Sequence, residues 1–189
     1  MIEASPAAPK ARSLSFVFMV FTGFLAIGIP LPAIVSFVRQ ELGLGSTLAG
    51  LAFGSQSLAT ILSRHAAGSM VDRHGARPIA LAAMPVLLLS TGLYLGSTLT
   101  GSAYTLVSLG LLLCGRVFAG IGESFLLISA MVWAINLSGI SNSGQVMARQ
   151  GLAMFLAIGV GGFVGVELMT TSGFASVAFV GGGRSAWRR

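Results

Sequence analysis

The chain has 189 residues, of which 54% are hydrophobic and only 8% are charged. Soluble domains carry about 25% charged residues, so this composition excludes an ordinary soluble protein and indicates a membrane protein. The eleven Lys and Arg residues outnumber the five Asp and Glu residues, but they are dispersed over ends and loops, which argues against nucleic-acid binding. The single cysteine, Cys114, excludes an internal disulfide, and no ligand cluster predicts a metal or a cofactor.

Five apolar stretches are long enough to cross a bilayer, because a spanning helix needs about 20 residues at about 1.5 Å each. They cover residues 14–38, 46–67, 79–99, 104–136 and 146–169, and a sixth apolar run, 174–180, is too short to span. We therefore predict an all-α integral membrane protein with five full transmembrane helices and a partial sixth.

These stretches predict one transmembrane bundle over 14–180, preceded by a cytoplasmic tail over 1–13. Within the first stretch, Gly28, Pro30 and Pro32 predict a kink or an end in its outer half. The last residues, 181–189, form a Gly- and Arg-rich tail that fits no spanning helix. This composition suggests a sixth helix that is cut short or replaced by out-of-frame residues.

The loop charges predict an orientation. Lys10 and Arg12 precede the first stretch, and Arg73 and Arg77 follow the second. The positive-inside rule then places the N-terminus and the segment 68–77 in the cytoplasm. We expect the protein in the plasma membrane, which is the inner membrane of a two-membrane cell. Three arginines near the C-terminus break the rule, which agrees with an aberrant end.

The segment between the second and third stretches holds the most specific pattern, formed by Gly68, Asp72, Arg73, Gly75 and Arg77. Gly68 would allow close approach of helices, and Gly75 would supply a turn with positive φ. The Asp72 carboxylate would accept bonds at a helix N-terminus, while the arginines would reach anionic headgroups. A generic basic loop is the simpler alternative.

The order Gly-x-x-x-Asp-Arg-x-Gly-x-Arg resembles the signature loop between helices 2 and 3 of the major facilitator superfamily, with all five key positions matched. Residues 59–64 are similar to its efflux-like branches, which are named for arabinose or drug export. The resemblance implies the N-terminal half of a fold built from two six-helix halves, truncated in its sixth helix, with a substrate site at the midplane. Residues 68–77 would form the conformational-switch loop.

Arg116 lies inside the fourth stretch, where insertion scales assign a charged residue a cost of about 2.5–3.5 kcal/mol. It must therefore face the bundle interior or a water-filled cavity. With Gly120 it is similar to the helix 4 motif of the superfamily, whose Arg is associated with proton coupling and substrate contact. Ala119 replaces the polar residue usual before that glycine.

Two further polar residues are candidates for the substrate or proton pathway. Glu123 lies two turns beyond Arg116 on nearly the same face, as either a proton carrier or a solvated acid. A direct Glu123–Arg116 salt bridge would have to span about 10 Å of helix rise. Gln56, in the second stretch, either lines a path or bonds to a neighbouring helix.

Small residues four positions apart predict close helix packing. The pairs are Gly50 with Gly54 and Gly161 with Gly165, and Gly120 adds a third position. The fifth helix of the superfamily carries a Gly-rich segment, often with Pro in exporters. Because Pro is missing here, this segment does not indicate a direction of transport.

The resemblance implies a secondary active transporter of a small solute that works by a rocker switch, with proton-coupled efflux as the implied form. Its expected partners are the bilayer, the solute and a separate or missing C-terminal six-helix half, without which we expect no transport. The alternative is a non-transporting membrane fragment or interaction partner. An intramembrane enzyme is remote: residues 72–77 faintly resemble a phospholipid alcohol transferase motif, but that chemistry needs several metal-binding carboxylates, and only Asp72 is available.

Overall fold

Helices make up nearly all of the part of the chain that the computed structural model describes, residues 10–182. In chain order they are α1 (Lys10–Gly28), α2 (Leu31–Ser36), the π-helix η1 (Phe37–Glu41), α3 (Ser46–His74), α4 (Ala76–Thr100), the 3₁₀ turn η2 (Gly101–Tyr104), α5 (Thr105–Ser138), the 3₁₀ turn η3 (Ile140–Asn142) and α6 (Ser143–Gly182). The predicted tails lie largely outside the described residues, although Lys10–Ser13 already belong to α1.

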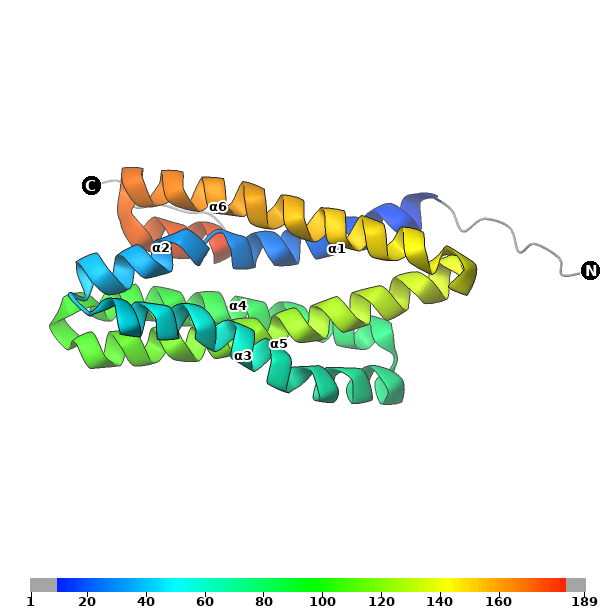
Figure 1. Cartoon of the computed structure of the whole chain (residues 1–189), viewed down its shortest axis with the longest axis horizontal. Helices are drawn as coiled ribbons and strands as arrows, with labels where there is room; N and C mark the ends of the chain where they lie inside the picture. The colour runs from blue at the N-terminus through cyan, green and yellow to red at the C-terminus, as the bar shows by residue number, and fades with distance from the viewer. Residues whose placement is uncertain (1–9, 183–189) are drawn as a thin grey trace, which may run out of the picture.

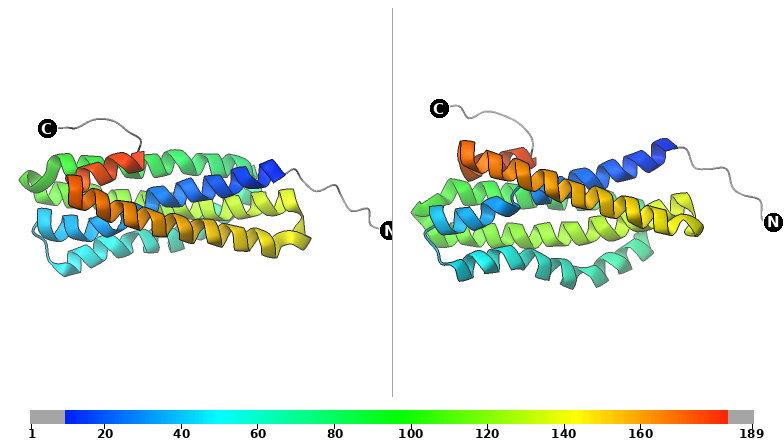
Figure 2. Two further views of the ribbon diagram at one scale, coloured as in Figure 1. Left: turned by 90° about the horizontal axis from the view of Figure 1, so that it is seen from above. Right: turned by 45° about the horizontal axis from the view of Figure 1, so that its top comes forward.

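The long helices run side by side along one axis (Figure 1). In this view α1, α2 and α6 form one layer, and α3, α4 and α5 form the other. The start of α1, the α3–α4 junction and the α5–α6 junction lie at one end of the bundle, and both turned views show the same order (Figure 2). The predicted cytoplasmic segments therefore share one end.

The first predicted stretch is divided where the prolines occur. The helix α1 ends at Gly28 and α2 begins at Leu31, so the expected kink is confirmed. Proline lacks a backbone N–H and its ring clashes with the preceding turn, which explains the break at Pro30 and Pro32. The chain then passes into the π-helix η1, in which Phe37 and Val38 are fully buried.

The helix α3 continues seven residues beyond the predicted 46–67, through Asp72 to His74. Its polar last turns remain helical because no helix breaker occurs before Gly75, where φ is +87°. The Gly75 N–H donates to Val71 O at 2.8 Å and closes the final turn. The expected loop over 68–77 is thus a helix end, a one-residue break and the start of α4.

The predicted count of five full spans and a partial sixth is not supported. Three of the described stretches are apolar and long enough to cross a membrane: Phe16–Glu41, Ala76–Ser138 and Ile140–Thr171. The helix α3 is not among them, because polar residues such as Gln56, Arg64 and His65 reduce its apolar character. The second stretch joins α4 and α5 because the turn η2 between them carries no charge.

The predicted partial sixth helix is not separate from the fifth, since helical backbone continues from Ser143 to Gly182 in α6. The path nevertheless bends, and the red end of α6 turns back (Figures 1 and 2). Val177 in this end is fully buried in a cluster with Ile29 of the first layer and Leu112 of α5. This cluster joins the two layers at one end.

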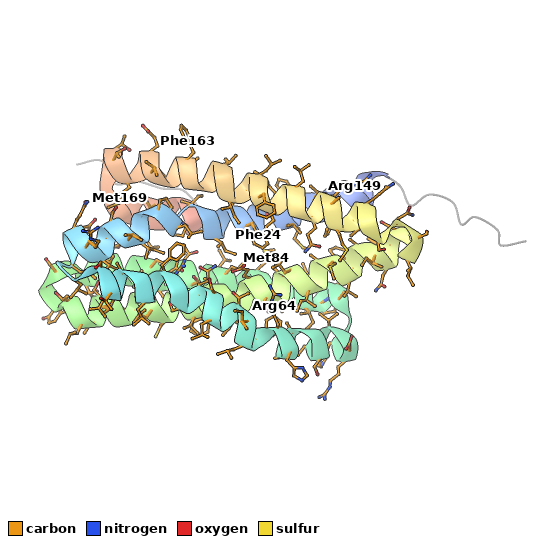
Figure 3. The ribbon with its side chains drawn as sticks, viewed as in Figure 1. Phe24, Arg64, Met84, Arg149, Phe163 and Met169 are labelled. Atoms are coloured by element: carbon orange, nitrogen blue, oxygen red, sulfur yellow. The ribbon has the colours of Figure 1, made fainter. Side chains whose placement is uncertain are left out.

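A second apolar cluster joins α1 to α4, α5 and α6 nearer the other end. Phe24 of α1 is only 1% exposed, and Figure 3 shows it between the two layers, close to Met84 of α4. Phe163 of α6 is 76% exposed and points away from the bundle in the same view. An exposed phenylalanine at this position fits contact with lipid.

Candidate polar site between α3 and α5

The helices α3 and α5 cross at Gly120. A Cβ atom built there would lie 2.3 Å from Gln56 O and 2.9 Å from Thr60 N, distances that no side chain tolerates. Glycine is therefore needed for this close approach. The crossing brings α3 against Arg116 and Glu123, the two charged residues of α5.

Arg116 of α5 is 2% exposed and binds the backbone of α3. Its Nε donates to Ala52 O at 3.0 Å, and its Nη2 donates to Phe53 O at 2.9 Å. The guanidinium carbon also lies 5.7 Å from the centroid of the Phe53 ring, within cation–π range. Two carbonyl dipoles and a ring face thus stabilise the charge, and no carboxylate of the described residues bonds to it.

One nitrogen of this guanidinium, Nη1, is buried and has no hydrogen-bond partner among the described residues. The Tyr94 hydroxyl of α4 is buried in the same region, and it interacts with Arg116 and with Ser90. The Tyr94 ring fits here because Gly115 leaves space, with a Cβ built on Gly115 only 2.7 Å from Tyr94 Cε1.

Glu123, the second charged residue of α5, contacts α3 about two turns further along α5. Gln56 Nε2 donates to Glu123 Oε2 at 2.8 Å, and Thr60 Oγ1 lies 3.2 Å from the same oxygen. Gln56 and Thr60 are each 6% exposed, whereas Glu123 is half-buried. The acid is therefore held on one side and open on the other.

The three predicted pathway residues, Gln56, Arg116 and Glu123, thus occupy one helix crossing. Arg116 and Glu123 each bind α3, and no direct bond joins them within the described structure. Sequence reasoning did not identify Thr60 or Tyr94. Thr60 could have been found, because it lies one turn from Gln56 on the same helix face; the carbonyls that bind Arg116 have no sequence signal.

The residues of the predicted switch segment lie at one end of the bundle and their charged side chains are exposed. Asp72 and Arg73 belong to the last turn of α3, and Arg77 to the first turn of α4. No atom of another described helix lies within 4 Å of a Cβ built on Gly68, so the expected close helix approach is not seen there. An open depression of about 520 Å³ beside it is lined by Arg64, His65, Gly68, Ser69, Asp72 and Arg73.

The predicted packing glycines divide into two groups. A Cβ on Gly165 would lie 2.0 Å from Ile29 O, and one on Gly161 would lie 3.0 Å from Ile29 N, so both are at a close α1–α6 contact. Gly50 and Gly54, by contrast, have nothing within 4 Å among the described residues. They line an open apolar groove of about 580 Å³ on α3, so the expected packing role is not seen there.

No group of three His, Cys, Asp or Glu side chains that could hold a metal occurs among residues 10–182. The arrangement is that of a helical membrane protein with a charged and polar cluster between two helices. Such intramembrane charges mark solute or proton pathways.

Comparison with known proteins identifies the family. Residues 16–186 match the Major Facilitator Superfamily, and the chain belongs to this family. An uncharacterized MFS-type transporter of Salmonella typhimurium is 36% identical over 160 residues, which cover 85% of this chain and 41% of that protein. A Burkholderia mallei relative of the same description is 34% identical over 167 residues, 87% of this chain and 41% of the relative.

The uncharacterized MFS-type transporter YhhS of Escherichia coli is 32% identical over 169 residues, which cover 89% of this chain and 42% of YhhS. The chain therefore spans about two fifths of the length of the relatives it matches. No solved structure matches the chain.

Proposed function

We propose that this chain forms the N-terminal half of a secondary active transporter that moves a small solute by a rocker switch. The family and its MFS-type transporter relatives support this proposal. The observation that carries it is the burial of Arg116 at the α3–α5 crossing, where backbone carbonyls stabilise its charge. A buried intramembrane charge is costly and is usually functional.

In this proposal Arg116, Glu123 and Gln56 belong to the substrate or proton pathway. Arg116 supplies a fixed positive charge, and Glu123 supplies a group that can bind a proton. The coupling ion is a proton and the direction is efflux. The family and its MFS-type transporter relatives favour a transporter over an intramembrane enzyme.

We further propose that the N-terminus faces the cytoplasm of a plasma (inner) membrane. The start of α1, the α3–α4 junction and Arg149 at the start of α6 lie at one end of the bundle (Figures 1 and 3). A basic end of this kind follows the positive-inside rule. Residues 68–77 then act on the inner side as the conformational switch.

We propose that the chain crosses the membrane five times in this orientation. A crossing needs about 20 residues, so the 63-residue stretch Ala76–Ser138 holds two, α4 and α5. The helix α3 is a further crossing whose polar residues Gln56 and Thr60 face α5 instead of lipid.

The topology can be tested with a cysteine that replaces His74 in a Cys114→Ala background. This cysteine should not react with an impermeant thiol reagent added outside intact cells. Labelling would contradict this topology.

Transport requires a second six-helix half, because a pathway must close around the solute from both sides. The experiment is reconstitution of this chain in liposomes, alone and with the C-terminal half of YhhS, followed by flux measurements with labelled sugars and drug cations. Flux is expected only with both halves, and it should disappear in Arg116→Ala but persist in Arg39→Ala, an exposed arginine at the other end. Flux by the chain alone would refute the need for a second half, and no flux by either preparation would refute the transporter proposal.

A non-transporting membrane protein or interaction partner is the second candidate. The open apolar groove along α3, which includes Gly50 and Gly54, favours it, because an unpartnered small-residue face suits contact with another helix. Flux in the two-half reconstitution separates this candidate from the first.

A further inference from the structure

The hydroxyl of Thr60 lies among three oxygen atoms that can accept its hydrogen. Gln56 O is 3.0 Å away, Gly120 O is 3.2 Å away and Glu123 Oε2 is 3.2 Å away. A threonine hydroxyl has one hydrogen to donate and two lone pairs to accept with. Thr60 can therefore donate to only one of the three oxygens at a time, and it retains the capacity to accept.

The two carbonyls do not depend on Thr60, because both belong to helix interiors in which carbonyls accept backbone N–H groups. The hydrogen of Thr60 is thus free to point either to Glu123 or to a carbonyl. Gln56 Nε2 donates to Glu123 Oε2 at 2.8 Å in either case. The carboxyl group is fixed by Gln56, and its second neighbour is a group that can reverse its role.

We propose that Thr60 makes Glu123 a reversible proton-binding site, by donating to the carboxylate when it is ionised and accepting from the acid when it is protonated. In the protonated state, Glu123 Oε2–H donates to Thr60 Oγ1, and Thr60 donates to Gly120 O. The hydrogen bonds then run in one direction, from Gln56 through Glu123 and Thr60 to α5. Thr60 is a positioning residue, since it acts through Glu123.

The surroundings favour a proton-carrying role over a fixed ion pair. On the two crossing helices, the charged residues next along the chain are Arg116, two turns before Glu123 on α5, and Arg64, one turn beyond Thr60 on α3. Arg116 bonds to α3 carbonyls, and no hydrogen bond or ion pair joins Arg64 to Glu123 in the described structure.

The other packed helices add no charge at this level. Residues 13–28 of α1 and 78–100 of α4 contain no charged residue. From α6, Gln150 reaches α5 through Leu127 O at 3.0 Å, and Arg149 beside it is exposed. Among the described residues, the hydrogen-bond partners of the Glu123 carboxyl group are thus Gln56 and Thr60, which are both uncharged.

This inference rests on the proposed proton coupling, but its test does not require transport. Infrared difference spectra of the 189-residue chain in lipid nanodiscs would be recorded between alkaline and acidic buffer, and repeated in D₂O. We expect a protonated-carboxyl band that appears on acidification, shifts in D₂O and is lost in Glu123→Gln. In Thr60→Val the band should move to higher wavenumber, because the acid loses its acceptor, and Thr60→Ser should restore the original position.

Circular dichroism would show whether each variant keeps its helix content, and Glu123→Gln tests the site even if Thr60→Val does not fold. Absence of a Glu123-dependent band, or an unchanged band in Thr60→Val, would overturn the inference. If the band behaves as expected but solute flux by the two-half preparation ignores a pH gradient, the proton site stands and the proposed coupling fails. If flux follows the gradient without such a band, the coupling stands and the site lies elsewhere.

Discussion

The α3–α5 and α1–α6 interfaces both depend on glycine, but they use the close approach differently. Between α1 and α6, Gly161 and Gly165 lie against the backbone around Ile29, where α1 is broken. Between α3 and α5, Gly120 brings Arg116 and Glu123 of one helix onto polar groups of the other. The α1–α6 contact depends on close packing of backbones, while the α3–α5 contact adds hydrogen bonds and charged groups.

This difference shows which contact can respond to its surroundings. A glycine-to-backbone contact does not change with pH or with a bound solute. A carboxyl group between Gln56 and Thr60 changes when it binds a proton, and an arginine on carbonyls can exchange one acceptor for another. We expect α1–α6 to determine stability and α3–α5 to determine function.

The largest effect on stability should come from Gly165→Leu. A Cβ there would lie 2.0 Å from Ile29 O, and overpacking of this kind costs about 1–3 kcal/mol or more. The free energy of unfolding, measured by SDS titration of the purified chain in mixed micelles, should fall by about 3 kcal/mol. Gly159→Leu is the control, because no other described helix comes within 4 Å of its Cβ position. An equal loss in both variants would contradict the α1–α6 contact.

Arg116→Leu should affect transport more than stability. The variant removes two charge-assisted hydrogen bonds to α3, each worth about 1.5–3 kcal/mol, yet it also removes the cost of a buried charge. We expect solute flux in the two-half reconstitution to fall by tenfold or more, since about 1.4 kcal/mol corresponds to a factor of ten. Arg39→Leu is the matched control; flux that survives in Arg116→Leu would remove this arginine from the pathway.

Gln56→Leu should have a smaller effect. It removes the 2.8 Å bond to Glu123 Oε2 and leaves the acid with Thr60 as its remaining described partner. Interhelical hydrogen bonds in membranes are worth about 1 kcal/mol, and the SDS-unfolding free energy should decrease by that amount. Ser57 is the exposed neighbour of Gln56, and Ser57→Leu should leave the unfolding free energy unchanged. Equal unfolding free energies for the two variants would show that the Gln56–Glu123 bond adds no stability.

The smallest effect is expected from Ser97→Ala, at the end of α4. Its hydroxyl donates to Ser108 O of α5 at 2.8 Å and also lies 3.0 Å from Ser108 Oγ. Bonds of this kind in membranes average about 0.6 kcal/mol. The unfolding free energy of Ser97→Ala should be lower than that of the exposed control Ser102→Ala by about 0.6 kcal/mol. If Ser97→Ala lost more stability than Gly165→Leu, the proposed ranking of the interfaces would be reversed.

Much of the helix layout could be predicted from the sequence, because backbone breaks depend on local residues. Pro30 and Pro32 divide the first helix, and Gly75 ends α3. The end of α3 was placed seven residues early because an apolar run measures contact with lipid, whereas helical backbone also continues through polar residues such as Arg73. The predicted number of spans is not supported for a related reason. By length and composition, α3 is too polar to count as a span, and α4 and α5 count as one continuous stretch.

The residues of the candidate site could also be named in advance, but their partners could not. An arginine within an apolar stretch is anomalous in any sequence, so Arg116 was evident from the cost of burying its charge. Its acceptors are backbone carbonyls of α3, which every residue possesses and no sequence pattern distinguishes. The division between buried Gly165 and open Gly50 likewise depends on which helices meet.

Composition, charge order and helix-breaking residues therefore determined by themselves that this chain is a helical membrane protein with the signature of its superfamily. Only the tertiary structure decided that Arg116 binds backbone, that Glu123 lies between Gln56 and Thr60, and which glycines are needed for contact. The physical reason is range: helix formation and lipid solubility follow from neighbours in the chain, whereas a polar site forms between residues more than sixty positions apart.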